Sequence, residues 1–384
     1  MSDRQFPVRP NLEQLKHQAK DLLRAEPSLG KLAHAQHALA RSYGLPSWSR
    51  LVLACRMTDA IWRDDVEAVR ELVVRHPRLL HENARGVAQS NWGPPMSYAA
   101  NLGRDRIIAM LRELGADDLN FAFDRACLQG RIDTARQLCA MGARPDGDSV
   151  AGPCETLCSP GLGFLLDLGC KLDLSHVALI LQTYSRNPAG KHQCLELTAT
   201  HGITLPDTPP MAVHRGRIDL LERHLEAINE RFSHEDIYPP ALGCDADHSK
   251  ALHGTPLAGG GLLHLAVDND EIEIAQWLLA HGVDVNLRAA IDADGFGGHT
   301  ALFGCVVSQP YRVGRRSSMT GLLLEHGADP NVRASLRKRL RYVADETMQE
   351  YRDVTPLAWG EQFHDQEWVD RDAMRLIADS RGTP

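Results

Sequence analysis

Apolar residues recur three and four positions apart in many short runs of this chain, and a glycine follows most of the runs. The run at 272–279 is representative, because Ile272, Ala275 and Leu279 fall on one helical face while Glu273 falls on the other. Such a run predicts a short amphipathic helix. A single helix of this kind cannot bury its apolar stripe alone, so neighbouring helices must stack on it.

The glycines that follow these runs are spaced semi-regularly along the chain. They are Gly115, Gly142, Gly169, Gly202, Gly282 and Gly327. The successive intervals are 27, 27, 33, 80 and 45 residues, and the interval of 80 has room for two units. A glycine after a helix adopts the left-handed conformation that other residues resist, so each one marks a helix C-terminus. The spacing predicts an array of helical repeats.

The clearest unit lies at 261–286 and reads Gly-Leu-Leu-His-Leu-Ala-Val-Asp-Asn-Asp-Glu-Ile-Glu-Ile-Ala-Gln-Trp-Leu-Leu-Ala-His-Gly-Val-Asp-Val-Asn. It resembles the ankyrin repeat, as does the segment ending Leu-Leu-Leu-Glu-His-Gly-Ala-Asp-Pro-Asn at Asn331. Further starts of the same motif occur at Thr300 and Thr355. The resemblance covers about residues 58 to 380 and implies an all-α fold: a solenoid of stacked helix-turn-helix units with short turn hairpins. It also implies that His264 fastens backbone between turns.

Residues 1–56 differ from the repeats. Asn11 is placed to cap a helix over 12–25, and a second helix fits 32–43 before Gly44. Together with the Gly-Leu-Pro-Ser-Trp sequence that ends at Trp48, this segment resembles the helical leader found before many bacterial ankyrin arrays. We therefore expect a helical leader and cap at 1–56. Residues 57–384 are expected to form about seven to nine repeat units, degenerate at 146–260.

The amino-acid composition and net charge exclude several classes of function for this chain. A hydrophobic fraction of 43% supports a folded core, and a net charge of −8 argues against the whole chain being a binder of nucleic acid or anionic membrane. The N-terminus has no apolar signal region, and no run of about 18 apolar residues is present. The nine cysteines are irregularly spaced and read as reduced thiols. We expect a cytoplasmic protein with no membrane partner.

Residues that could bind phosphate, bind zinc or act in catalysis each have a structural explanation as well. The glycines at 259–261 and 295–298 precede helices but lack the phosphate-binding loop signature. Cys154 and Cys158 form only one close pair, whereas a structural zinc site commonly uses two. Cys127, Cys139 and Cys305 occupy core positions of the repeat, and no nucleophile signature accompanies the 18 histidines. We expect no catalytic residues, no metal and no cofactor.

The partner is expected to be another protein, held by a monomeric chain. In the repeat at 261–286, Asp268 and Asn269 are expected to be exposed on the inner helix, and the following turn carries Asp292, Asp294 and Phe296. Insertions at 286–300 and 331–355 should project from the same turn edge, where binding faces often form. The second insertion adds Arg337, Arg341 and Tyr342, which gives mixed charge with aromatic anchors.

Two alternatives remain open from the sequence. The first is a regulator that contacts nucleic acid or another polyanion through the arginines of 312–341, including Arg312, Arg315 and Arg316. In the structural interpretation the same basic run forms an amphipathic insertion helix with solvated charges. The second is an enzyme with a site in the irregular segments 146–210 or 233–260.

Overall fold

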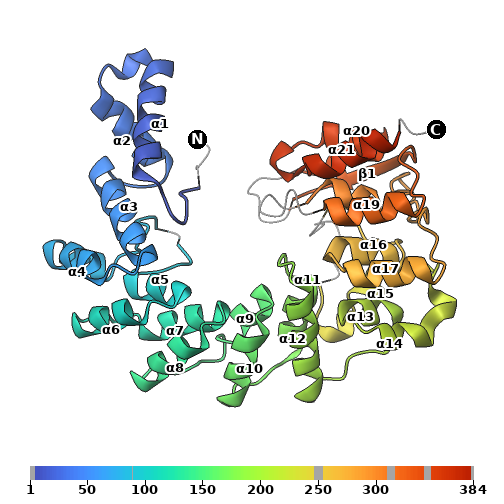
Figure 1. The fold of residues 1–384 in the computed structure, drawn as a ribbon, viewed down its shortest axis with the longest axis horizontal. Helices are drawn as coiled ribbons and strands as arrows, with labels where there is room; N and C mark the ends of the chain where they lie inside the picture. The colour runs from blue at the N-terminus through green and yellow to red at the C-terminus, as the bar shows by residue number, and fades with distance from the viewer. Residues whose placement is uncertain (1–4, 89, 246–253, 309–315, 341–346, 382–384) are drawn as a thin grey trace. The chain divides into compact units, whose positions relative to one another are not determined.

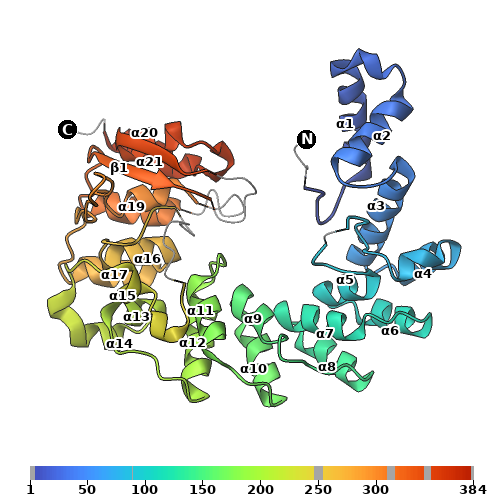
Figure 2. The ribbon, with the colours of Figure 1, turned by 180° about the vertical axis from the view of Figure 1, so that it is seen from behind.

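The computed structural model describes residues 5–88, 90–245, 254–308, 316–340 and 347–381. The chain divides into two compact units, Met1–Lys171 and Leu172–Pro384. Each unit consists mainly of short helices joined by tight turns, as the two opposite views in Figure 1 and Figure 2 show. The predicted all-α class is confirmed.

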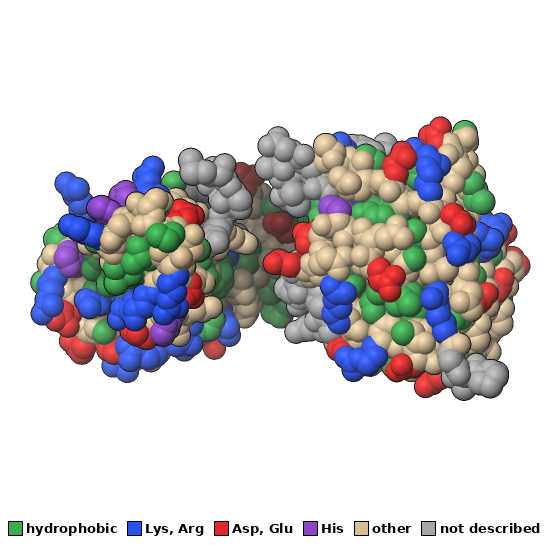
Figure 3. All heavy atoms as spheres, turned by 90° about the horizontal axis from the view of Figure 1, so that it is seen from above, with side chains coloured by type: hydrophobic (Ala, Val, Ile, Leu, Met, Phe, Trp, Pro, Cys, Tyr) green, Lys and Arg blue, Asp and Glu red, His purple; other side chains and the backbone are tan. Residues whose placement is uncertain are grey.

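The N-terminal unit begins with the leader, formed by α1 (Leu12–Ala25), the 3-10 turn η1 (Pro27–Leu29) and α2 (Leu32–Ser42). The side chain of Asn11 accepts a hydrogen bond from the N–H of Gln14 at 3.0 Å, which confirms the predicted cap of the first helix. Tyr43 ends α2 just before Gly44, one residue from the predicted end. In Figure 3 the face of this unit turned toward the viewer carries many Lys and Arg side chains around a smaller group of hydrophobic ones.

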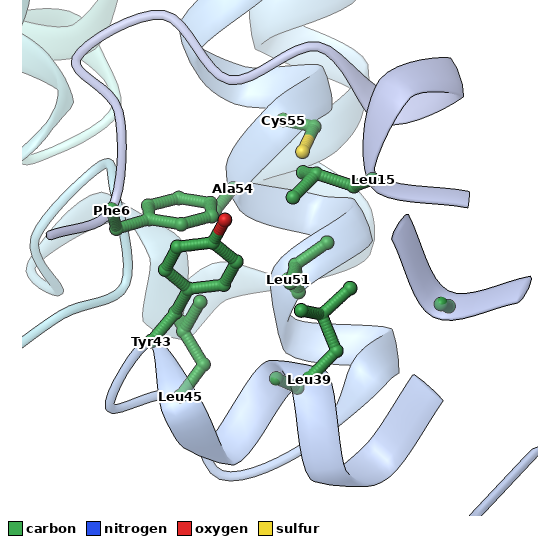
Figure 4. Close-up of a cluster of buried hydrophobic side chains, with 10 residues drawn as sticks. Phe6, Leu15, Leu39, Tyr43, Leu45, Leu51, Ala54 and Cys55 are labelled. Atoms are coloured by element: carbon green, nitrogen blue, oxygen red, sulfur yellow. The ribbon is translucent and has the colours of Figure 1, made fainter. Parts of the chain in front are cut away.

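The leader packs on α3 (Trp48–Trp62), whose first half closes the leader core shown in Figure 4. Leu15, Leu39 and Leu51 come from the three helices and are buried in one cluster. Phe6 joins them from the segment before α1 and packs edge-on against Tyr43, with ring centroids 5.3 Å apart. The boundary expected between 56 and 57 falls inside α3.

The remainder of the N-terminal unit is a series of helix pairs. Its elements are α4 (Val66–Arg75), η2 (Pro77–Leu80), α5 (Pro95–Leu102), α6 (Asp105–Glu113), α7 (Leu119–Leu128), α8 (Ile132–Ala140), α9 (Ala151–Thr156) and α10 (Ser159–Asp167). Gly115, Gly142 and Gly169 follow the second helices of successive pairs with φ values of 99°, 107° and 90°. The glycines therefore end helices in the predicted left-handed conformation.

The C-terminal unit contains shorter and less regular helices. They are α11 (Leu174–Gln182), α12 (Pro188–Thr200), α13 (Pro209–His214), α14 (Ile218–Leu221), η3 (Glu222–Ala227), α15 (His234–Ile237), η4 (Pro240–Leu242), α16 (Leu262–Asn269), α17 (Ile272–Ala280), α18 (Phe303–Val306), α19 (Ser317–Glu325), α20 (Pro356–Gln362), η6 (Gln366–Trp368) and α21 (Arg371–Ser380). The helices α13, α16, α18 and α20 contact one another in chain order. This is the nearest-neighbour stacking of a repeat array.

His281 and His326, which precede capping glycines, contact carbonyl oxygens in the last turns of α17 and α19. The Nδ1 atom of His281 lies 2.7 Å from the carbonyl oxygen of Trp277, and Nδ1 of His326 lies 2.8 Å from that of Leu322. Each imidazole adds a second contact to a last-turn carbonyl that already accepts the backbone N–H of the same histidine. None of the described helices is both long and apolar enough to cross a membrane.

The predicted insertion helix in the basic run after Asn331 is wrong, because these residues form a β-hairpin. Strand β1 (Ala334–Lys338) pairs antiparallel with β2 (Gln349–Val354), and Leu336 is opposite Tyr351. Residues along β1 alternate between buried and half-buried positions. That period of two puts apolar Ala334 and Leu336 on one face, whereas a helix would have split them between two faces.

Candidate functional site

Three successive turn regions of the C-terminal unit, at 256–261, at 287–300 and at 331–340 with 347–355, are joined by backbone hydrogen bonds. The N–H of Ala290 donates to the carbonyl of Gly259 at 2.9 Å, and the N–H of Gly297 donates to that of Ser335 at 2.7 Å. Within the middle turn, the N–H of Ala289 donates to the carbonyl of His299 at 2.8 Å. The predicted alignment of both insertions on one turn edge is therefore seen in the structure.

The buried imidazoles of His264 and His299 form hydrogen bonds with the backbone of these turns. Nδ1 of His264 accepts a hydrogen bond from the N–H of Gly261 at 3.1 Å, so Nε2 carries the proton and donates to the carbonyl of His299 at 3.1 Å. Nε2 of His299 lies 2.9 Å from the carbonyl oxygen of Pro256. Burial lowers the pKa of His264 to about 4 and that of His299 to about 3, so both rings are neutral at pH 7. His264 fastens backbone between turns, as the family resemblance implied.

Glycine is required where the turns approach most closely. Gly297 has a φ of 123°, and a Cβ atom there would lie 2.0 Å from the carbonyl oxygen of Ala290. Gly259 has a φ of 76°, and its Cβ would lie 2.8 Å from the Cβ of Ala290. These glycines let the turns pack together, which matches the structural interpretation of the glycine-rich segments rather than a phosphate-binding loop.

Acidic residues of the middle turn hold Arg337 of the hairpin. The guanidinium of Arg337 contacts Asp292 and lies 2.9 Å from the carboxylate of Asp294. Asp292 is itself fixed, because its carboxylate accepts the N–H of Phe296 at 2.9 Å. The hydrogen bonds and charges of Asp294 and Asp292 raise the pKa of Arg337, which stays protonated. Three residues predicted from the two insertions are thus brought together.

Phe296 was expected to be exposed, and the structure corrects this, because only 4% of the residue is accessible. Its ring lies under two guanidinium groups, with the Cζ atoms of Arg337 and Arg352 at 4.7 Å and 4.2 Å from the ring centroid. Cation–π contacts of this kind favour a fixed ring. Phe296 therefore packs against Arg337 and is not available as an exposed contact residue for a partner.

A pocket of about 380 Å³ opens across the three turns. Its described lining comprises Pro256, Ala258, Ala290, Asp292, Phe296, Gly297, His299, Ser335, Leu336, Arg337, Met348 and Glu350. The pocket combines apolar walls with a few fixed charges, which is the composition of ligand sites and of hot-spot pockets in interfaces. Ile291 and Met348 add exposed apolar surface on the same turns, with 63% and 38% of each residue accessible.

Asp268 and Asn269 were expected to be exposed contact residues on the inner helix, and this was wrong. Both are buried, with 1% and 3% of each residue accessible. Nε of Arg186 donates to the carbonyl of Asp268 at 2.9 Å, and Nζ of Lys191 lies 2.8 Å from Oδ1 of Asn269. Long basic side chains from just before and within α12, 82 and 78 residues earlier in the chain, cover the end of α16. Burial raises the pKa of the Asp268 carboxyl.

The described members of the basic run do not form one exposed patch. Arg316 is buried, and one of its guanidinium nitrogens lies 2.6 Å from the carboxylate of Asp270. Lys338 is also buried. Arg333 is exposed and lies 2.8 Å from the carboxylate of Asp353, an exposed pair that neutralises much of its charge. Arg312, Arg315, Arg341 and Tyr342 lie outside the described residues.

Sequence reasoning missed the pocket residues that come from the hairpin and from the turn before α16. Leu336, Met348 and Pro256 were not singled out, and Glu350 was predicted to be a solvated charge that balances the basic run. The alternation of Ala334, Leu336 and Leu340 is a strand signal that would have identified the hairpin. The pocket itself depends on contacts between segments more than 30 residues apart, such as that between His264 and His299.

Other candidate chemistry has mainly structural explanations. Cys127 and Cys305 are buried, as their core positions predicted, and Cys139 is half-buried. Within the described ranges, no group of three or more His, Cys, Asp or Glu side chains is arranged to hold a metal ion. The most unusual buried group is Lys191, whose Nζ also lies 2.8 Å from Nδ1 of His214. Burial lowers the pKa of Lys191 to about 7.

Comparison with known proteins agrees with the repeat geometry. The family model for the ankyrin repeat matches residues 261–290. The human ASB11 ankyrin repeat domain is 17% identical, with a TM-score of 0.28, and the match covers 76% of this chain and 99% of that one. The Bcl-3 ankyrin repeat domain is 16% identical, with a TM-score of 0.24, and the match covers 84% and 97%. No curated protein matches this chain. Both structures are distant, so the comparisons show an ankyrin repeat at residues 261–290 of this chain.

Proposed function

We propose that this chain, an ankyrin-repeat protein by its repeat at 261–290, is a non-catalytic scaffold that holds a partner protein at the turn edge of its C-terminal unit. Ankyrin repeats generally mediate protein–protein interaction. The observation that carries the proposal is the pocket of about 380 Å³ that spans three consecutive turns. The turns surrounding it are fixed by backbone hydrogen bonds, so a partner meets a surface that is already ordered.

The surface chemistry suits a protein better than a polyanion. Arg337 is already paired with Asp292 and Asp294, and Arg352 lies 3.1 Å from Glu350. A phosphate backbone gains affinity by releasing counterions from unpaired basic groups, and these pairs leave it little to gain. Exposed apolar groups beside fixed charges are instead the usual composition of a protein interface.

The proposed contact set differs from the one expected from the sequence. It keeps Asp292, Asp294 and Arg337, adds Ile291 and Met348, and treats Phe296 as a support beneath them. Arg341 and Tyr342 stay in the proposal as neighbours of the hairpin in sequence. Asp268 and Asn269 are left out because they are buried.

The proposal also covers state and location. We propose a monomer in a reducing, cytoplasmic compartment, since all nine cysteines are free thiols. Burial raises the pKa of Cys55 to about 12 and that of Cys305 to about 11, so these thiols stay protonated and unreactive.

Site-specific photo-crosslinking in the source cell tests the proposed surface. A photoreactive phenylalanine analogue replaces Met348 at the pocket, and the matched control replaces exposed Glu273 on the outer helix α17. We expect one protein adduct in stoichiometric yield from position 348 and none from position 273. Adducts to nucleic acid, or protein adducts from the control position alone, would contradict the proposal.

A further inference from the structure

The middle turn pairs with β1 at a single residue. The N–H of Ser335 donates to the carbonyl of Gly297 at 3.2 Å, and the N–H of Gly297 donates to that of Ser335 at 2.7 Å. The backbone groups of Ser335 therefore point away from β2. Backbone groups alternate along a strand, so the N–H and C=O of Arg337 point to this same edge, while Leu336 and Lys338 face their partners in β2.

The middle turn leaves this edge before it reaches Arg337. In a continued antiparallel ladder, residue 295 would stand opposite Arg337. Instead the N–H of Gly295 donates to the carbonyl of Asp292 at 3.0 Å, and the N–H of Asp292 donates to the carbonyl of Phe296 at 2.8 Å. These two bonds close the loop on itself. The edge of β1 is thus left without a backbone neighbour from this loop where the pocket opens.

We propose that the edge of β1 at Arg337 accepts an extended segment of the partner protein by strand addition, and that one bulky apolar side chain of that segment enters the pocket. The inference rests on the proposed function and specifies how the partner is held. An open strand edge supplies main-chain hydrogen bonds, and a pocket beside it selects among the alternating side chains of the added strand.

The pocket chemistry selects an uncharged side chain. Pro256, Leu336 and Met348 line it, and its volume of about 380 Å³ is large enough for an aromatic or long aliphatic group. The charges at the rim are already paired with one another. A charged side chain would therefore lose its hydration without gaining an unpaired counter-charge, which disfavours a charged residue at this position.

The test uses a randomised dodecapeptide library displayed on phage and selected on the purified full-length chain. The selected peptides are synthesised with a fluorescent label, and their affinity is measured by fluorescence polarisation. Each peptide is then remade with one backbone N-methyl group at each position in turn. We expect a loss of about tenfold or more at one position and little loss at the others, because Ser335 is already paired with Gly297 and one peptide amide meets the carbonyl of Arg337.

Three variants place the bound peptide on the chain. Arg337→Pro removes the N–H at the open edge without removing a bond of the β1–β2 ladder, and Arg337→Ala is its matched control. We expect binding to weaken about tenfold in Arg337→Pro relative to Arg337→Ala. Ala290→Trp fills the pocket and should abolish binding. If Arg337→Pro fails to fold, the N-methyl series and Ala290→Trp still decide the question.

The possible results distinguish a failure of strand addition from a failure of the proposed scaffold function. Peptides whose binding ignores both Ala290→Trp and backbone N-methylation overturn strand addition, as does a library that yields no binder blocked by Ala290→Trp. If crosslinking at Met348 still captures a single protein, the scaffold function stands and only the mode of binding is wrong. If that crosslink also fails, the proposed function is wrong as well.

Discussion

Nε2 of His264 donates to the carbonyl oxygen of His299 across 3.1 Å, and this bond joins the first helix of one repeat to the turn that begins the next. Both rings are buried, with 3% and 1% of each residue accessible. The pair also supports the wall of the pocket, since His299 lines it. The same side chain therefore affects stability and the geometry of the proposed binding surface.

Replacing His264 with Ala is expected to destabilise the C-terminal unit by about 1–3 kcal/mol, because a buried carbonyl and a buried N–H lose their partner. Urea unfolding measures the change. His37→Ala is the control, since His37 is exposed on α2 and its side chain makes no hydrogen bond among the described residues. Equal midpoints for the wild type and His264→Ala would show that the imidazole is not structural.

Acid should destabilise the C-terminal unit between about pH 6.5 and 4. The pKa of His264 is lowered to about 4 in the folded chain, and that of His299 to about 3. The unfolded chain binds these protons near pH 6.5, so it holds more protons than the folded chain within that window. Stability is therefore lost as the pH falls. Urea midpoints measured at pH 7.5, 6 and 5 check this, and His264→Ala should show a shallower slope.

Lys191 should make the stability of the chain depend on pH in the alkaline range. Its pKa is lowered to about 7 in the folded chain by burial first and by Arg186 second, against an ordinary value of 10.5, although Glu271 and Asp268 oppose the shift. The unfolded chain therefore binds more protons between pH 7 and 10.5, and this group makes folding more favourable as the pH rises through that window. Lys191→Met should remove the rise. Parallel stability curves for both chains from pH 7 to 10 would show that the lysine is not buried.

Deleting residues 1–46, which include α1 and α2, is expected to expose Leu51 and Cys55 on α3, because these side chains share a buried cluster with those two helices. The truncated chain should melt at a lower temperature and aggregate. Adding Leu51→Glu to the truncated chain should restore solubility, since it places a charge on the newly exposed face. Light scattering at matched concentration compares the two. A truncated chain that is soluble without the second substitution would mean that the leader folds independently.

The repeat architecture could be predicted because it is local. A glycine that ends a helix and a His that binds the carbonyl four residues earlier, as His281 does, need only the neighbouring residues, so sequence spacing reveals them. The leader helices follow from Asn11 and an apolar stripe for the same reason.

The site was only partly predictable because its contacts are long-range. Asp268 looks exposed in its own repeat, but Arg186, 82 residues earlier, and Arg316, 48 residues later, both contact its carbonyl. Phe296 lies beside flexible glycines in sequence, but two arginines of the hairpin cover it. The hairpin was mistaken for a helix because its many charges outweighed the period-two pattern of Ala334 and Leu336.

The most direct test of the central claim is the affinity of the captured partner, measured by calorimetry, for two matched variants. Met348→Asp changes an exposed apolar residue at the turn edge, and Phe121→Asp changes one of similar exposure on α7 in the other unit, with 38% and 40% of each residue accessible. We predict that Met348→Asp weakens binding at least about tenfold and that Phe121→Asp leaves it unchanged. Loss of binding in Phe121→Asp with full affinity in Met348→Asp would contradict the account and place the partner on the N-terminal unit.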